Sequence, residues 1–333
     1  MGPDREAVRR VLGAAAPKDI GDGGFDRAVW RALWALTWQA PGACGHDGRP
    51  GPSALALCLV AEELGAALRP EPFIPAVMAA RLLPANWLRA VVAGERIVLP
   101  AWQEHPGGLE TARTTVLCDG RLRGRKVLIP MAPAVDGFVV TLPDGAALVE
   151  RDGGGLRLEI ADMGDGVPIG SLVLDGAPAE RIPGDVGAAL DEAILASAAY
   201  LLGLMDRAAS LTRGALASRR NLTRRTRVVE ALRQQRMDEI AVQLVLTRSA
   251  VGSAAATLDA TPRAAVRGSV VSKAWLRGVD AGLVVTRACV LLVSVQALPG
   301  VAELERFQRR AGVVGRLYGS VMAHRARFPV GPG

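Results

Sequence analysis

The chain has 333 residues, of which half are hydrophobic and 22% are charged. It is therefore long enough and apolar enough to fold around a large core, and it lacks the composition of a disordered protein. Its formal net charge of +7 comes from 37 arginines against three lysines, and the arginines are spread from Arg5 to Arg327. The net charge by itself does not indicate a nucleic-acid-binding protein.

The cysteines and the start of the chain predict a cytoplasmic location. The four cysteines have no paired spacing, as expected for free thiols in a reducing compartment. The start, "MGPDREAVRRVLG", has no apolar signal-sequence core, and Arg287 interrupts the most membrane-like stretch, at 281–300. We expect no membrane contact, and three scattered histidines predict no metal site.

Residues 1–93 are predicted to form a helical domain. Val29, Leu33 and Leu36 recur at helical spacing. "GPSALALCLVAEELGAAL" predicts a helix that Ser53 caps and that ends before "RPEPF". "AVMAARLL" and "NWLRAVVAG" predict two further short helices.

Residues 94–183 are predicted to form a small β domain. Short apolar runs such as "RIVLP", "RGRKVLIP" and "GFVVTLPDGAALVE" alternate with Asp-Gly pairs. Asp-Gly between apolar runs is typical of a hairpin, because glycine takes the positive φ that tight turns require. The Gly-rich pieces "DGGGL" and "GDGVPIG" have no phosphate-loop spacing and are predicted to be turns.

Residues 184–333 return to the helical period. Four long segments are predicted to be helices, at 186–218, 226–259, 263–297 and 301–328. Thr261-Pro262 and Leu298-Pro299-Gly300 separate the last three. Four long apolar helices with short connections predict an antiparallel bundle, so the chain is of the α+β class.

The order of these regions and several motifs resemble the acyl-CoA dehydrogenase family. "LALCLVAEELGAALRPEPFIPAVMAARLL" resembles the family's N-terminal helix pair, and "TARTTVLCDGRLRGRKVLIPMAPAVDGFVV" resembles its middle-domain segment. "LLGLMDRAASLTRGALASRR" and "EALRQQRMDEI" resemble its bundle. The resemblance covers nearly the whole chain. It implies an N-terminal helical domain, a β-barrel-like middle domain and a C-terminal four-helix bundle.

The resemblance also implies a function. Family members bind FAD across a subunit interface and oxidise an acyl-CoA thioester. A glutamate removes the α-proton while the β-hydride passes to the flavin. This chemistry needs a carboxylate at the α-carbon and hydrogen-bond donors on the thioester carbonyl.

The chain departs from the family at its flavin-contacting elements. The Thr-Glu-Pro loop is replaced by "PAWQEHPGG", which has no hydroxyl from Ala101 to Gly108. The Trp and Thr of the W-I-T motif fall on Leu128 and Pro130, and proline has no N–H to donate. The Q-L-H-G-G turn aligns with "LLVSV" at 291–295, where both glycines are lost.

The catalytic base is also altered. In one branch of the family, the register of the first bundle helix places the glutamate at Ala193, with Asp191 and Glu192 just before it. A one-residue shift turns a helical side chain by about 100°, so Glu192 substitutes only if the helix starts differently. The other branch offers Glu303 and Glu305. We take Glu192 as the candidate base; the alternative is that these acids are partners of a helix N-terminus.

The segment "RRNLTRRTRVVEALRQQR" at 219–236 contains seven arginines. The resemblance places this loop against the FAD pyrophosphate of a partner subunit, so Arg219, Arg220 and Arg224 are candidate ligands through charge-assisted hydrogen bonds. The alternative is a solvated interface loop. Nucleic acid is disfavoured, because no aromatic side chains are interleaved with the arginines.

Two functional hypotheses remain open. In the first, the chain is the divergent small subunit of a heteromeric acyl-CoA dehydrogenase, in a dimer or tetramer whose motif-complete partner keeps the flavin and the acid. In the second, it is a flavin-free, repurposed homodimer that acts as a binding or structural protein. A complete homomeric dehydrogenase is a third possibility.

Overall fold

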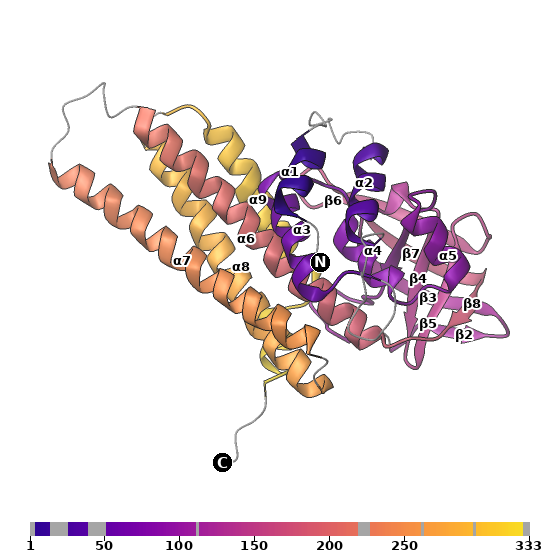
Figure 1. Ribbon diagram of the computed structural model, residues 1–333. Coiled ribbons are helices and arrows are strands. Elements are labelled where there is room, and N and C mark those ends of the chain that lie inside the picture. Colours follow the sequence, from indigo (N-terminus) through magenta and orange to yellow (C-terminus); the bar gives the residue numbers. More distant parts are fainter. Residues whose placement is uncertain are drawn as a thin grey trace, which may run out of the picture.

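The computed structural model describes most of the chain, in seven stretches. These are residues 4–13, 26–38, 51–110, 113–218, 227–260, 263–295 and 298–328. A helical layer and a β region lie at one end of the molecule, and a bundle of long helices extends away from them (Figure 1). The sequence predicts a change from helical to strand-like patterning near residue 94 and the reverse near 184. Both positions lie in short links, between α5 and β1 and between β8 and α6.

The described residues of the N-terminal layer form five helices. They are α1 (Arg5–Gly13), α2 (Arg27–Thr37), α3 (Ala54–Ala66), α4 (Phe73–Ala80) and α5 (Ala85–Val92). Ser53 caps α3 by accepting a hydrogen bond from the Ala56 amide, as its sequence predicts, and Asp26 caps α2 in the same way. Trp30 and Trp34 are completely buried, with their ring centroids 5.6 Å apart in an edge-to-face arrangement. The layer is therefore fixed by aromatic packing.

The middle region holds two four-stranded sheets. Its strands are β1 (Val98–Ala101), β2 (Val116–Cys118), β3 (Arg121–Pro130), β4 (Gly137–Leu142), β5 (Gly145–Glu150), β6 (Leu156–Asp162), β7 (Pro168–Pro178) and β8 (Glu180–Ile182). The sheet orders are β1-β4-β5-β8 and β2-β3-β7-β6. Two Asp-Gly pairs connect antiparallel neighbours, β2 to β3 and β4 to β5, as predicted. Asp119 and Gly120 both have positive φ, 48° and 72°, because the tight turn requires it.

The C-terminal region is a helical bundle. It consists of α6 (Val186–Ser218), α7 (Arg227–Asp259), α8 (Ala264–Ser294), α9 (Val301–Leu317) and the short α10 (Val321–Arg325). The prediction of one helix over 301–328 is wrong. Gly319 has a φ of 94°, and a Cβ there would lie 2.7 Å from the Leu109 side chain. This left-handed residue ends the α9 segment, and Ser320 then caps α10.

Helix α6 is the central element of the protein, since it packs against α3, α4, α7, α8 and α9. Two glycines let α3 and α6 approach closely. A Cβ on Gly203 would lie 1.7 Å from the Glu62 carbonyl oxygen, and one on Gly65 would lie 2.0 Å from that of Tyr200. Only glycine can occupy this crossing without moving a backbone.

Among the described residues, two helices, α6 and α7, are long and apolar enough to cross a membrane by length and composition alone. The apolar stretch of α6 is entirely buried inside the protein, as for a core helix, whereas that of α7 is only one-third buried. Figure 1 shows α7 running along the outside of the bundle. Helix α7 thus presents apolar side chains on an outer face.

Candidate functional site

A cleft of about 630 Å³ opens beside the loop in which the sequence predicts altered flavin contacts. It lies between the loop that follows β1, the first turns of α6 and the α10 region. Its lining includes His105, Glu110, Leu190, Asp191 and Arg327. We call it the 105–110 cleft.

The loop beside this cleft is held in place by Glu104. Its carboxylate accepts hydrogen bonds from the backbone amides of Arg113, Thr114 and Thr115 at 2.8–2.9 Å. Burial would raise the pKa of Glu104, but these hydrogen bonds outweigh it and hold that pKa well below its usual range. Glu104 is therefore an ionised anchor for the loop.

Lys126 supports the same loop from inside the β region. It is fully buried, and its Nζ donates to the Trp102 carbonyl at 3.3 Å, to Glu104 at 3.3 Å and to Thr141 Oγ1 at 3.2 Å. Burial lowers its pKa to about 8, and the carboxylate of Glu104 opposes that shift. This network is a structural one, because all three donor directions are used.

Two pairs of rings stack near the bundle, and one of them includes the loop after β1. Trp102 stacks on Tyr318 with ring centroids 6.4 Å apart, and His324 stacks on Trp275 at 3.9 Å. All four side chains are buried. The stacking packs Trp102 against the end of α9.

The candidate base Glu192 lies in a buried ion pair. Its Oε2 accepts a hydrogen bond from Arg81 Nε at 2.9 Å, and the two side chains are only 1% and 5% exposed. Arg81 also donates to the Pro52 carbonyl and lies over the Trp38 ring. Glu192 does not line the 105–110 cleft. The structure gives this carboxylate a counter-ion function, and its function as a base stays a prediction.

Asp191, one residue earlier, does line the cleft. Adjacent helical residues point about 100° apart, which explains why only one of the two faces it. The Asp191 carboxylate is 2% exposed and binds two arginines, Arg267 at 2.9 Å and Arg327. Sequence alone offered no signal for this pairing, since Arg327 is 136 residues away.

The other candidate acids lie elsewhere. Glu303 is in the first turn of α9 and lines a different cleft, between α3, α6 and α9. Glu305 is half-exposed and lies 3.8 Å from Arg309 on the same helix. Neither acid lines the 105–110 cleft.

The candidate phosphate ligands Arg219, Arg220 and Arg224 lie outside the described residues. The helix ends that flank them, of α6 and α7, lie at the end of the bundle remote from the β region (Figure 1). A small cavity of about 290 Å³ there is lined by residues including Arg213, Glu230 and Arg233. Interaction of these arginines with a pyrophosphate stays a prediction.

The described residues at the flavin-contacting positions do not fit FAD by themselves. Leu128 has a φ of 57°, and Pro130 pairs with Ile169 in the sheet without an N–H to donate. At the end of α8 the Val295 amide donates to the Leu291 carbonyl. This backbone amide is therefore used within the helix and is not available to a ligand, as it would be in a glycine turn. Within the described stretches, no cluster of three or more His, Cys, Asp or Glu side chains is arranged to hold a metal ion.

The chain matches no protein-family model and no curated protein in sequence. Its fold, however, is similar to solved structures over almost its whole length. A variant of the Tcur3481-Tcur3483 steroid ACAD superposes with a TM-score of 0.82 at 24% identity, covering 97% of this chain and 94% of that one. PigA with FAD and proline gives 0.80 at 18% identity, with the same coverage of each chain.

The ChsE4-ChsE5 complex from Mycobacterium tuberculosis gives a TM-score of 0.77 at 21% identity, and again covers 97% and 94% of the two chains. These similarities include acyl-CoA dehydrogenases and extend across the helical layer, the β region and the bundle. The resemblance in the sequence is confirmed at the level of the fold. The chain therefore has the acyl-CoA dehydrogenase fold from its N-terminal helices to its bundle.

Proposed function

We propose that this chain is the divergent subunit of a cytoplasmic, heteromeric acyl-CoA dehydrogenase. It would contribute to FAD-dependent α,β-desaturation of an acyl-CoA thioester together with a homologous subunit that retains the flavin and base motifs. Two of the similar structures, the Tcur3481-Tcur3483 steroid ACAD and the ChsE4-ChsE5 complex, are each named for two components. That pairing supports a two-subunit assembly here.

The observation that carries the proposal is the ion pair of Glu192 with Arg81. Removal of an α-proton needs a carboxylate that can reach the substrate and accept a proton. Glu192 is buried against a guanidinium, and Asp191 is bound by two arginines. The remaining acid of the 105–110 cleft, Glu110, is half-exposed and pairs with Arg113. The base is therefore assigned to the partner subunit.

The outer face of the bundle supports a partner. Large apolar side chains on α7 and α8 are exposed in the single chain, and we call them together the α7–α8 face. They are Val229, Leu232, Val242, Val245, Leu246, Val266, Leu283, Val284 and Leu291. An apolar face of this extent is typical of a surface that another subunit covers.

The chain's own contribution to flavin binding would come from the α6–α7 loop. We propose that Arg219, Arg220 and Arg224 bind the pyrophosphate of the FAD held by the partner. Guanidinium groups bind phosphate oxygens through forked, charge-assisted hydrogen bonds, so this contribution would not need the lost glycines or hydroxyls. FAD itself supplies the acceptor for the substrate hydride when it is bound in such enzymes.

Flavin stoichiometry tests the proposal. The chain purified alone should be colourless. Co-expressed with a motif-complete dehydrogenase subunit, it should yield a yellow complex with one FAD per pair of chains, and Arg219→Ala should lower FAD retention without separating the subunits. A yellow homomer with one FAD per chain would refute the proposal, because the altered positions would then suffice to hold flavin.

A flavin-free binding protein is the second candidate. The stacking of Trp102 on Tyr318 favours it, because two large buried rings fill space between the β region and α9. A colourless homodimer that binds no acyl-CoA in titration calorimetry, alone or beside any flavin-containing subunit, would support this second candidate over the first.

A further inference from the structure

Strand β6 forms a long outer edge of the β region. It has seven residues and is the last strand of the β2-β3-β7-β6 sheet. The other edge strands offer less to a partner, because β2 and β8 have three residues each and β1 is buried and packs against α4. Apart from β7, the described element that packs closely against β6 is the short turn η2 (Ala132–Ala134). We call the side of β6 that faces away from β7 the β6 edge.

The backbone along the β6 edge is regular. The register of β6 on β7 has no shift, and the Asp175 amide donates to the Gly155 carbonyl at 2.8 Å, just before the strand begins. Hydrogen-bonded and non-hydrogen-bonded pairs alternate along an antiparallel ladder. Leu156, Leu158 and Ile160 therefore direct their N–H and C=O groups away from β7. The β6 edge presents these groups as a row of backbone donors and acceptors.

The β6 edge lacks the common features that prevent strands from pairing. Edge strands are often protected by proline, lysine or a bulge. The sequence of β6, "LRLEIAD", has no proline or lysine, and its pairing with β7 has no bulge. Leu156, Leu158 and Ile160 lie on one face of the strand, and Ile160 is 50% exposed in the single chain. A second strand beside β6 would cover it.

The charges of β6 complement a second copy of β6 in one antiparallel register. When Leu158 faces Leu158 of the second copy, Arg157 of each chain faces Glu159 of the other. Opposite charges directly across a strand pair stabilise it, and like charges destabilise it. Moving the two-fold axis to Glu159 would place two glutamates face to face and leave Arg157 opposite Ala161. Charge therefore selects the register centred on Leu158.

Both charged side chains lie on the outer face of the sheet. The Arg157 side chain is 67% exposed and that of Glu159 is 37% exposed. Within the chain Glu159 contacts Arg157 and also binds Arg125 of β3 at 3.0 Å. These contacts hold the carboxylate above the sheet, where the arginine of a second copy can reach it.

We propose that β6 pairs with β6 of a second copy of this chain, antiparallel and centred on Leu158, to form one continuous sheet across two chains. Strand addition at an exposed edge gains main-chain hydrogen bonds, and the side chains set the register. Leu156 of each chain then covers Ile160 of the other. A contact of this kind uses the same surface on both chains, so it closes with two-fold symmetry.

The pairing is separate from the α7–α8 face and from the proposed activity. Strand β6 belongs to the β region, whereas that face belongs to the bundle. Pairing through β6 joins two assemblies that the bundle forms into one larger assembly. The contact involves neither flavin nor acyl-CoA, so its success or failure does not depend on the proposed function.

Disulfide cross-linking between chains tests the register. Cys44 and the exposed Cys118 are first replaced by serine, which leaves the buried Cys58 and Cys289. In the proposed pair, positions 157 and 159 of opposite chains form a non-hydrogen-bonded pair with Cα atoms about 4.5 Å apart, which a disulfide can bridge.

Co-expressed Arg157→Cys and Glu159→Cys chains should therefore cross-link into dimers under mild oxidation. One Arg157–Glu159 pair stays intact in each mixed dimer. The matched control is co-expressed Arg157→Cys and Ala161→Cys, which keeps the same charges but places the two thiols diagonally, with Cα atoms about 7–8 Å apart. That distance is at or beyond the limit for a disulfide, so the control should cross-link at least about tenfold more slowly.

Each variant expressed alone is a second control, because two copies of position 157, or of position 159, are also diagonal in the proposed register. Circular dichroism checks folding, which should persist because all three substituted positions lie at the edge of the sheet. The proposal is overturned if the 157 and 159 thiols do not cross-link, or if the 157 and 161 thiols cross-link as fast.

Discussion

Arg81 and Glu192 form an ion pair inside the protein, with 2.9 Å between the guanidinium Nε and the carboxylate Oε2. The pair joins the end of α4 to the start of α6 across 111 residues of sequence. Because both side chains are almost fully buried, each charge depends on the other for compensation. Helix α6 is thereby anchored to the N-terminal layer at the position where the sequence predicts a base.

Glu192→Gln should therefore destabilise the fold. The substitution keeps the size of the side chain but removes the negative charge facing Arg81, and breaking a buried pair in this way costs about 3–5 kcal/mol. Urea unfolding measures the loss, and Glu305→Gln on the exposed face of α9 is the matched control, with an expected change within about 0.5 kcal/mol. If Glu192→Gln leaves the unfolding free energy unchanged but abolishes α-proton exchange, Glu192 is the base after all.

The crossing of α3 and α6 provides a second prediction. Gly203→Ala should destabilise the protein by at least about 1–3 kcal/mol, because its Cβ would meet the Glu62 carbonyl oxygen at 1.7 Å and two backbones must separate. Gly214→Ala is the control on the same helix, where a Cβ meets nothing within 4 Å. There alanine should stabilise the helix by about 0.5–1 kcal/mol. Equal melting temperatures for the two variants would contradict the close crossing.

The buried His324 predicts a pH dependence. Burial lowers its pKa from 6.5 to about 4, the Tyr318 carbonyl opposes that shift, and the charge of Arg327 adds to it. The unfolded chain binds a proton in the window from about 6.5 to 4 that the folded chain does not, so the contribution of His324 to stability is lost as the pH falls through this window. Between pH 7 and 5 the loss is about 2 kcal/mol.

The measurement is urea unfolding of the wild type and of His324→Gln at pH 7 and pH 5. Glutamine can replace the hydrogen bonds to Ser272 and Tyr318 but does not titrate, so the variant should lose about 2 kcal/mol less than the wild type over this interval. Parallel pH dependences for the two proteins would show that His324 is not held neutral.

The α7–α8 face predicts that the single chain is not a stable monomer. Val245 and Val284 are 63% and 53% exposed in the isolated chain. If a partner subunit covers these positions, an aspartate introduced at either one would have to be buried without a counter-ion, which is costly. The double substitution Val245→Asp with Val284→Asp should dissociate the assembly, and Val116→Asp, at an exposed position in the β region, should not. Light scattering distinguishes the outcomes. A wild-type mass near 34.8 kDa at micromolar concentration, the mass of one chain, would contradict the prediction.

Much of the architecture could be predicted from local sequence. The Ser53 cap, the Asp-Gly turns and the helical periodicity of α6 depend on short-range rules of backbone conformation, and the structure confirms each of them. The order of the three regions followed from the changes in hydrophobic periodicity along the chain, and the fold of similar solved structures agrees with it. The interruption after α9 was missed, because Gly319 takes a positive φ where Leu109, more than 200 residues earlier, leaves no room for a Cβ.

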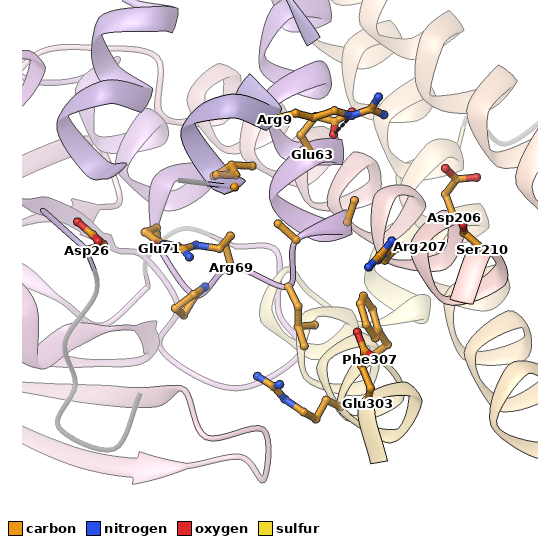
Figure 2. A pocket seen from close by; sticks show the side chains of 17 residues that line it. Arg9, Asp26, Glu63, Arg69, Glu71, Asp206, Arg207, Ser210, Glu303 and Phe307 are labelled. Carbon is orange, nitrogen blue, oxygen red and sulfur yellow. Dashed lines mark hydrogen bonds and ion pairs between the residues drawn. The ribbon is translucent and has the colours of Figure 1, made fainter. Parts of the chain in front are cut away.

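The burial and the ion-pair partners of the candidate acids were decided by the tertiary structure alone. Sequence placed Asp191 and Glu192 side by side at the start of a helix, but their partners Arg267, Arg327 and Arg81 come from other elements. The same is true of the cleft between α1, the α3–α4 turn, α6 and α9 (Figure 2), because its lining residues are far apart in the sequence. Local sequence determines where a helix begins and which residues share its faces. The charge and solvation of a side chain depend on long-range packing, which no short stretch of the sequence contains.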